Sequence, residues 1–385
     1  MLNILNKKNG CWLVGGLAFD NKVDAMIYAS KTNSYLRFYF HDHMWESFDR
    51  NLLGKYSLNE LYRQRAEQLR DTYDYLILYY SGGADSHNIL RTFIDNKIKL
   101  DELRVKWPKP LKDGKLYIPN NKDSSAKNTV SEWDFAIKPQ LDKLYSDHPE
   151  IKISFIEYTE NIDRQKIKVE TLEQEFYNLK MYKGSFASFV QRLNRDLYTN
   201  LNTRKKEGHI FGTDKPILNL GLKSIDLVFV DILIENTLFP SGIDNFNTEF
   251  FYWTPDFPLL PMEQAYQTAK FIKENKLFDC INLDSINPQS DTLKNKKESL
   301  RLIQKKILYQ DTWNNNIFQA GKPKPLLDDV YFWMFENNEF DLLKNNFNIA
   351  VKNIFSQIDD RYLLSNPKGS ILSETYTKGF KILDL

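Results

Sequence analysis

A continuous apolar run at residues 75–80 is followed by Ser81 and two glycines, and then by an amphipathic segment. An apolar run of this length without alternation is typical of a strand buried on both faces of a parallel sheet. Residues 85–96 place apolar side chains at helical spacing on one face: Ile89, Leu90, Phe93 and Ile94. The sequence therefore predicts a strand, a tight turn and a helix.

The segment before this strand also has the pattern of a helix. Ser57 stands three residues before Glu60, which is the spacing of a capping box. Apolar residues then recur at helical spacing: Leu58, Leu61, Tyr62 and Leu69. We expect the charged residues of this helix to face solvent: Arg63, Arg65, Glu67 and Arg70.

Short strand candidates broken by polar turns occur in residues 11–45, and strands then alternate with helices from residue 74 to 216. Residues rich in aromatic and β-branched side chains predict strands at 11–19, 34–40, 103–107, 151–159 and 208–212, while 25–30 fits a strand or a helix equally well. Helices are predicted over 131–149, interrupted by Pro139, and over most of 164–206. This alternation indicates a parallel α/β sheet with helices on its faces.

The pattern changes near residue 236, where the chain becomes loop-rich and contains four prolines between 240 and 261. Helical patterns then predominate, at 262–275, 294–309 and around 328–336. We therefore expect a β-rich N-terminal extension (1–70), an α/β domain (71–240) and a helical C-terminal region that binds substrate or a partner (241–385).

Composition excludes several classes of protein. Lys and Arg (52) almost balance Asp and Glu (51), so net charge gives no reason to expect affinity for nucleic acid or membranes. Only Cys11 and Cys280 occur, which excludes a disulfide scaffold and a structural zinc site. We found neither a signal-peptide pattern nor an apolar run long enough to span a membrane. The expected location is the cytoplasm. The sequence leaves open whether the protein forms a homo-oligomer.

The turn Ser81-Gly82-Gly83-Ala84-Asp85-Ser86 has the chemistry of a phosphate site. Glycines let the backbone approach phosphate oxygens, the first amides of a helix are unpaired donors, and Ser81 and Ser86 add hydroxyls. Asp85 would repel phosphate unless Mg²⁺ lay between them. Neither the Walker spacing nor GxGxxG is present. The alternative is a tight turn with Asp85 and Ser86 as caps.

This string resembles the SGGxDS signature of the PP-loop (N-type) ATP pyrophosphatases. The resemblance spans about residues 73–96 and implies a parallel five-stranded PP-loop sheet of the adenine nucleotide alpha hydrolase type, Mg²⁺ and ATP, and adenylylation of a substrate oxygen with release of pyrophosphate. It implies that Ser81, Gly82, Gly83, Asp85 and Ser86 hold the pyrophosphate, with Asp85 also binding Mg²⁺.

A second segment, Gly212-Thr213-Asp214-Lys215-Pro216, follows a predicted strand. In asparagine synthetase-like members a turn here supplies a second metal-facing carboxylate beside a basic residue. By that resemblance Asp214 would bind Mg²⁺ and Lys215 would neutralise the departing pyrophosphate, although the acidic pair usual in asparagine synthetase is missing. The alternative is a simple turn with an exposed lysine. Together with residues 251–258, these motifs resemble asparagine synthase-like proteins of large tailed phages, which implies the host cytoplasm.

Other candidates have structural explanations that we favour. His41 and His43 fit a surface pair better than a metal site, and His87 merely flanks the predicted phosphate site. Trp253, with its neighbours Asp256 and Phe257, could line an acceptor pocket but is expected to pack a loop onto the core. The lysine-rich stretch over 294–324 is expected to be a solvated face, so nucleic acid is a possible partner but not the favoured one.

These observations predict an ATP-dependent ligase that adenylylates a small-molecule or nucleotide acceptor and then forms a C–N bond. Leu2 stands where the family's glutamine-hydrolysing domain has cysteine, so ammonia, an amine or a partner glutaminase would supply nitrogen. Two alternatives stay open, an enzyme that modifies a nucleotide or nucleic-acid base and a non-catalytic ATP-binding protein. Sulfur transfer is disfavoured because only two cysteines are present.

Overall fold

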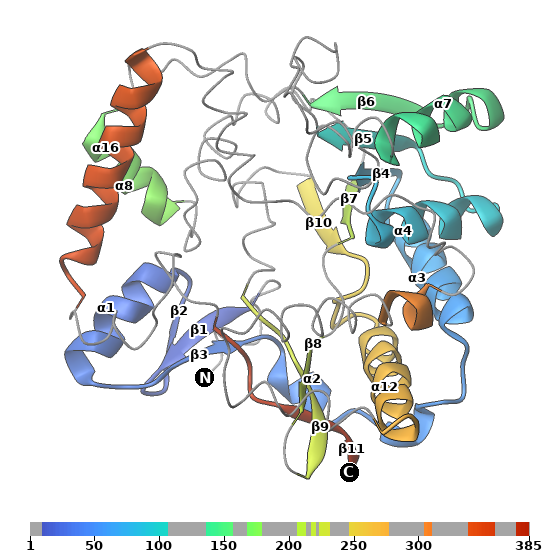
Figure 1. Ribbon diagram of the computed structural model, residues 1–385, viewed down its shortest axis with the longest axis horizontal. Coiled ribbons are helices and arrows are strands. Elements are labelled where there is room, and N and C mark those ends of the chain that lie inside the picture. The colour runs from blue at the N-terminus through green and yellow to red at the C-terminus, as the bar shows by residue number, and fades with distance from the viewer. Residues whose placement is uncertain are drawn as a thin grey trace.

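The computed structural model shows a central parallel sheet, two smaller antiparallel sheets and the helices that connect them (Figure 1). The residues that the structure describes are 10–106, 136–156, 168–178, 206–212, 217–220, 223–231, 246–276, 304–309, 338–358 and 375–384.

The central sheet contains five parallel strands in the order β10-β7-β4-β5-β6. They are β4 (Tyr75–Tyr80), β5 (Glu102–Lys106), β6 (Lys152–Ile156), β7 (Glu207–Phe211) and β10 (Phe246–Phe250). The expected α/β class and five-stranded parallel sheet are confirmed. The sheet continues past residue 240, the expected end of the α/β domain, because β10 forms its edge.

The apolar run predicted to be a buried strand is β4, the middle strand of this sheet. From β4 the chain adds β5 and β6 on one side, then returns to add β7 and β10 on the other. The connection that leaves β4 therefore runs toward one edge of the sheet, and the connection that leaves its neighbour β7 runs toward the other edge. In open α/β sheets, such a switch point at the carboxyl ends of the strands is where ligands bind.

Three helices lie along the same side of the sheet: α3 (Leu58–Thr72), α4 (Ala84–Asp95) and α7 (Lys138–Asp147) (Figure 1). The predicted cap of α3 is confirmed, because the Ser57 hydroxyl accepts a hydrogen bond from the Glu60 amide at 3.2 Å. Contrary to the prediction, Pro139 does not interrupt α7. It occupies the first turn, where a proline costs no intrahelical hydrogen bond.

Arg65 is buried, which contradicts the prediction that it faces solvent. Its side chain is 2% exposed and forms an ion pair with Glu249 of β10 at 2.8 Å. Arg65 follows Leu61 by four residues and precedes Leu69 by four, so it falls within the apolar stripe of α3. A buried carboxylate on the edge strand β10 compensates the guanidinium, and the pair fixes α3 to the sheet.

The N-terminal unit combines an antiparallel sheet, ordered β2-β1-β3, with a helix. Its elements are β1 (Cys11–Val14), β2 (Leu17–Phe19), α1 (Lys22–Thr32), β3 (Leu36–Tyr39), α2 (Asp42–Glu46) and the 3₁₀ helix η1 (Arg50–Leu52). Residues 25–30, which fitted a strand or a helix, belong to α1. Asn21 starts this helix by accepting hydrogen bonds from the amides of Val23 and Asp24.

A third sheet, ordered β11-β9-β8, was not predicted. It contains β8 (Ile217–Leu220), β9 (Ser224–Val228) and, from the region expected to be helical, β11 (Phe380–Asp384). Helix α12 (Leu259–Glu274) packs against both this sheet and α3. The pairing of β9 with a strand about 150 residues later leaves no local signal in the sequence.

Part of the predicted C-terminal helical region is confirmed, in α12 and in residues 304–308, whereas 328–336 lies outside the described residues. Helix α16 (Asn338–Phe355) packs with α8 (Val169–Asn178), on the side of the molecule opposite α7 (Figure 1). Among the helices that the structure describes, none combines the length and apolar character needed to cross a membrane.

Candidate functional site

Residues 81–83 join the carboxyl end of β4 to the first turn of α4, at the switch point of the sheet. Gly82 adopts a left-handed conformation, with φ at +74°. Gly83 is the N-cap of α4, and no side-chain hydrogen bond caps the helix within the described residues. The first turn of α4 thus presents main-chain amides without a capping side chain, the arrangement that binds anions in many proteins.

The two glycines of the loop are under different steric constraints. A Cβ at Gly82 would lie 2.8 Å from Cγ1 of Ile137 and 3.2 Å from Cβ of Ala136. A Cβ at Gly83 would meet only Oγ of Ser81, at an ordinary 3.5 Å. The fold therefore requires glycine at position 82, while nothing in the described structure requires it at position 83.

We predict that Gly82→Ala destabilises the protein by about 1–3 kcal/mol, because alanine is strained at positive φ and collides with Ile137. Gly83→Ala should change the unfolding free energy by less than about 1 kcal/mol, because two effects offset each other. Alanine is a poorer N-cap than glycine, which destabilises the fold, but it also lowers the entropy of the unfolded chain, which stabilises the fold. Chemical denaturation of both variants measures the difference. Equal destabilisation by the two changes would contradict this account of the loop.

The two loop serines differ in their surroundings. The Ser86 side chain is buried, and its hydroxyl donates to the Gly83 carbonyl at 3.2 Å and accepts from the Ser81 amide at 3.3 Å. Ser81 is exposed, and its hydroxyl lies 3.3 Å from that of Ser86. Ser86 thus closes the loop from within, while Ser81 lies on its outer side.

Asp85 is half-buried in the first turn of α4 and is held at two points. The Tyr309 hydroxyl donates to Asp85 Oδ1 at 2.5 Å, and the Tyr252 hydroxyl donates to the Asp85 carbonyl at 2.8 Å. Asn88, one turn later, donates to the Tyr252 hydroxyl at 3.0 Å. Sequence reasoning missed both tyrosines, because they lie far from Asp85 along the chain.

The end of β7 lies directly against this loop. A Cβ at Gly212 would approach the Ser86 amide nitrogen to 3.0 Å and the Asp85 carbonyl carbon to 3.2 Å. The structure thus brings the start of the second motif next to the first. Asp214 and Lys215, two and three residues further on, lie outside the described residues, so their predicted roles stay predictions.

Within the described residues, the histidines belong to no group that could hold a metal. The predicted surface pair is wrong for His41, which is buried at the N-cap of α2, whereas His43 is exposed and its Nδ1 lies 2.9 Å from the Tyr39 hydroxyl. Burial lowers the pKa of His87 to about 4, and its Nδ1 lies 3.2 Å from the Tyr80 hydroxyl. The His87 imidazole, which lies beside the loop, is therefore uncharged at neutral pH. Within the described ranges, no group of three or more His, Cys, Asp or Glu could hold a metal.

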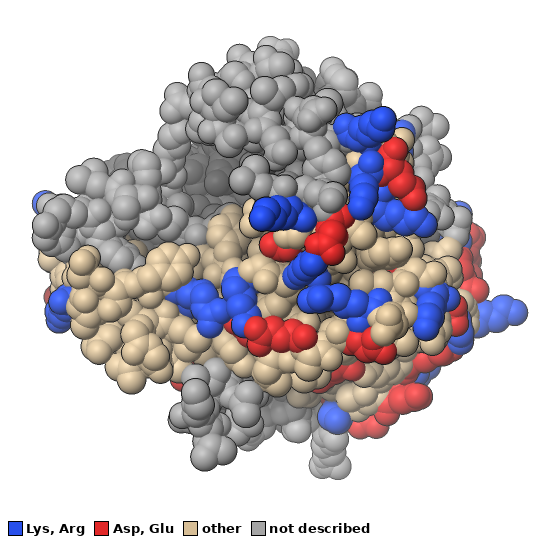
Figure 2. Space-filling view, turned by 90° about the horizontal axis from the view of Figure 1, so that it is seen from below, with Lys and Arg blue, Asp and Glu red and all other residues tan. Residues whose placement is uncertain are grey.

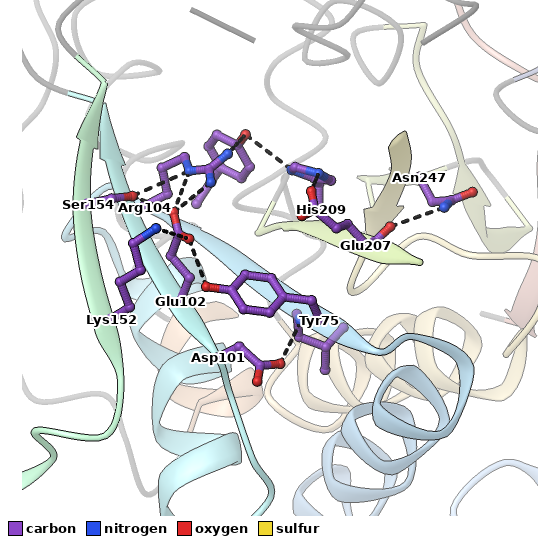
Figure 3. Close-up of polar contacts among 11 residues, drawn as sticks. Tyr75, Asp101, Glu102, Arg104, Lys152, Ser154, Glu207, His209 and Asn247 are labelled. Carbon is purple, nitrogen blue, oxygen red and sulfur yellow. Dashed lines mark hydrogen bonds and ion pairs between the residues drawn. The ribbon is translucent and has the colours of Figure 1, made fainter. Parts of the chain in front are cut away.

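A second polar cluster crosses one face of the central sheet (Figure 3). Arg104 and Glu102 of β5 form an ion pair at 2.6 Å, and Arg104 also donates to the Tyr79 hydroxyl at 3.3 Å. That hydroxyl lies 3.3 Å from His209 Nδ1, and His209 Nε2 lies 3.2 Å from Glu207. Burial of charged groups is unusual in a parallel sheet, whose faces are normally apolar.

The alternation within the strands contained a signal for this cluster that we did not use. Residues 102–106 and 207–211 place polar side chains at every second position: Glu102, Arg104 and Lys106, then Glu207 and His209. Paired residues of neighbouring strands share a face, so Glu102 and Arg104 lie on the same face of the sheet as Glu207 and His209. The cluster lies on a sheet face rather than at the loop of residues 81–83.

Glu102 should make the stability of the protein depend on pH. Burial alone would raise its pKa, but Arg104, the Ser154 hydroxyl and Lys152 outweigh burial and lower the pKa below 4.5. A lowered pKa stabilises the fold above the unfolded-state value and loses that contribution as pH falls through the folded-state value. We expect Glu102→Gln to cost about 1.5–3 kcal/mol at neutral pH.

The difference between wild type and Glu102→Gln should shrink as the pH falls from the ordinary carboxyl pKa through the lowered pKa of Glu102 in the folded protein, where the carboxylate becomes protonated in both states. Urea unfolding from neutral to acid pH checks this. Exposed Glu150 provides a matched control, since Glu150→Gln should leave the pH dependence almost unchanged. A difference that stayed constant with pH would mean that the carboxylate charge contributes nothing.

On the face of the molecule seen from below, Lys and Arg are interspersed with Asp and Glu, and neither sign forms a continuous patch (Figure 2). The described residues on this face form no extended basic groove that could bind nucleic acid. Most of the lysine-rich stretch over 294–324 lies outside the described residues. The favoured structural explanation for Trp253 is confirmed, since its side chain is 1% exposed and packs edge-on against Phe229.

No protein-family model matches the sequence, and no curated protein matches it either.

Proposed function

We propose that the protein binds ATP at residues 81–86 and splits it to AMP and pyrophosphate, adenylylating an oxygen of an acceptor. The observation that carries this proposal is the position of the SGGADS loop. It leaves the central strand of a parallel sheet at the switch point, turns through a left-handed glycine and starts a helix without a side-chain cap. Oriented amides and the helix dipole favour an anion at this position.

The donor groups at this loop fit Mg²⁺ and phosphate better than a transition metal. Mg²⁺ takes oxygen ligands, commonly one or two carboxylates together with phosphates and water. Asp85 supplies a carboxylate in the first turn of α4, and within the described residues it belongs to no group of three or more His, Cys, Asp and Glu side chains that could hold a metal. Bound there, Mg²⁺ would neutralise charge on the leaving pyrophosphate. By resemblance, Asp214 would be the second carboxylate and Lys215 an additional positive charge.

In the proposed reaction an acceptor oxygen attacks the α-phosphorus, and the bond to the bridging oxygen of pyrophosphate breaks. The protein would hold the pyrophosphate on the amides at the start of α4 and align it with the attacking oxygen. Ammonia or an amine would then attack the activated carbon, forming the C–N bond and releasing AMP. The acceptor would be a small molecule or a nucleotide, since the nearly balanced net charge gives no reason to expect affinity for a polyanion.

Product analysis tests this proposal. The protein is incubated with ATP, Mg²⁺ and a panel of amino acids, organic acids and nucleotides, and the nucleotide products are separated. Equal amounts of AMP and pyrophosphate that appear with one acceptor would support adenylylation and identify the acceptor class. Formation of ADP and phosphate, or no turnover with any acceptor, would contradict it.

A further inference from the structure

Residues 304–309, far along the chain from the glycine loop, lie against the first turn of α4. Tyr309 is the contact residue, because its hydroxyl donates to Asp85 Oδ1 at 2.5 Å. This distance is within the range of a charge-assisted hydrogen bond between a hydroxyl and a carboxylate. The Tyr309 side chain is 1% exposed, so water does not compete for the bond.

An aromatic cluster of three buried tyrosines keeps Tyr309 in place. The rings of Tyr62 and Tyr252 lie 6.4 and 5.8 Å from that of Tyr309. The Tyr62 hydroxyl, from α3, donates to the Leu308 carbonyl at 2.7 Å and accepts from Gln264 of α12 at 2.9 Å. Helices α3 and α12 thus fix the main chain beside Tyr309, while Tyr309 itself contacts the carboxylate.

We propose that Tyr309 is a positioning residue that orients the Asp85 carboxylate for a Mg²⁺ ion bound with ATP. This inference rests on the proposed function. Tyr252 fixes the main chain of Asp85 through its carbonyl, and Tyr309 fixes one oxygen of the side chain. Hydrogen bonds to a metal-binding carboxylate set its direction, and their loss commonly weakens metal binding by about 10- to 100-fold.

The surroundings of Tyr309 favour a hydrogen bond to Asp85 that persists when Mg²⁺ binds, rather than one that the ion displaces. Tyr309 is buried and its hydroxyl faces the Asp85 carboxylate, an acceptor, so the phenol is the donor of this bond. A carboxylate oxygen can accept this hydrogen bond while the group also binds a cation. If the bond broke, a buried donor would lose its charged acceptor, which is unfavourable.

Calorimetric titration of ATP at a series of Mg²⁺ concentrations, and in EDTA, tests the inference by binding rather than by turnover. Tyr309→Phe should raise the Mg²⁺ concentration needed for half-maximal ATP affinity by about 10- to 100-fold and leave ATP binding in EDTA unchanged. Tyr62→Phe is the matched control. It removes a hydroxyl that holds the same segment at Leu308 but does not contact Asp85, so the Mg²⁺ requirement should rise far less than in Tyr309→Phe.

Both variants keep their rings, and thermal unfolding of each variant checks that it folds. An equal rise in the Mg²⁺ requirement of both variants would assign Tyr309 a purely structural role and overturn the inference. A lower requirement in Tyr309→Phe would show that the phenol competes with the ion, which overturns it as well. If wild type binds ATP with a Mg²⁺ requirement that Tyr309→Phe leaves unchanged, only this inference fails. If wild type binds no ATP, both it and the proposed function fail.

Discussion

Replacing Asp85 by Asn should lower the acceptor-dependent release of pyrophosphate from ATP by about 100- to 1,000-fold. The substitution removes the negative charge that would bind Mg²⁺ beside the phosphates. It keeps a side-chain oxygen that can accept the hydrogen bond from Tyr309, so the fold should be preserved. The effect therefore measures the charge of Asp85 rather than its packing.

The matched control is Asp95→Asn, which removes a carboxylate from the last turn of the same helix. Asp95 forms an exposed ion pair with Arg91, four residues earlier, and lies at the opposite end of α4 from the glycine loop. Pyrophosphate release should be unchanged in this variant, since exposed pairs contribute little to stability. Equal activity of wild type and Asp85→Asn would show that the carboxylate binds no catalytic metal.

Asp231→Asn should destabilise the protein by about 3–5 kcal/mol, since it leaves a buried ammonium without its carboxylate. The Lys22 ammonium lies 2.5 Å from Asp231 Oδ2, and each side chain is 2% exposed. Asp231 also accepts hydrogen bonds from the Trp12 indole at 3.1 Å and the Thr375 amide at 3.2 Å. One carboxylate thus joins the N-terminal unit to the segment that precedes β11.

Urea unfolding of three variants checks this prediction. The double variant Lys22→Met/Asp231→Asn should be more stable than Asp231→Asn alone, because an apolar side chain of similar length replaces the uncompensated charge. Asp226→Asn, on strand β9 of the same region, is the control, since Asp226 is only half-buried. A loss below about 1 kcal/mol in Asp231→Asn would mean that water reaches Lys22.

Local patterns were sufficient to predict the part of the fold that forms from neighbouring residues. The run at 75–80, the glycine turn and the amphipathic helix gave β4 and α4, and Ser57 gave the start of α3. Arg65 was misplaced because a charge usually indicates solvent, and its partner Glu249 lies 184 residues away. The third sheet was missed for the same reason, since β9 pairs with β11 across a long separation.

The candidate site also contains both residues that the local sequence predicted and residues that only the structure identifies. The sequence motif identified the residues of the loop, and the structure adds what surrounds them: Gly212 against the Ser86 amide, and Tyr252 and Tyr309 against Asp85. These contacts join segments more than 120 residues apart, and no periodicity in the sequence specifies them. The polar face around Arg104 was readable from strand alternation, but an isolated alternating strand does not reveal its partner strands.

The central claim is that residues 81–86 bind ATP, and calorimetric titration of ATP in saturating Mg²⁺ with wild type and Gly83→Ala tests it most directly. A Cβ at Gly83 has room within the protein, so this variant should fold with nearly wild-type stability. The methyl group would occupy the loop surface that a phosphate must approach. The account predicts that wild type binds ATP and that Gly83→Ala binds it at least about 10-fold more weakly. Equal affinity of the two proteins, or no binding by wild type, would contradict it.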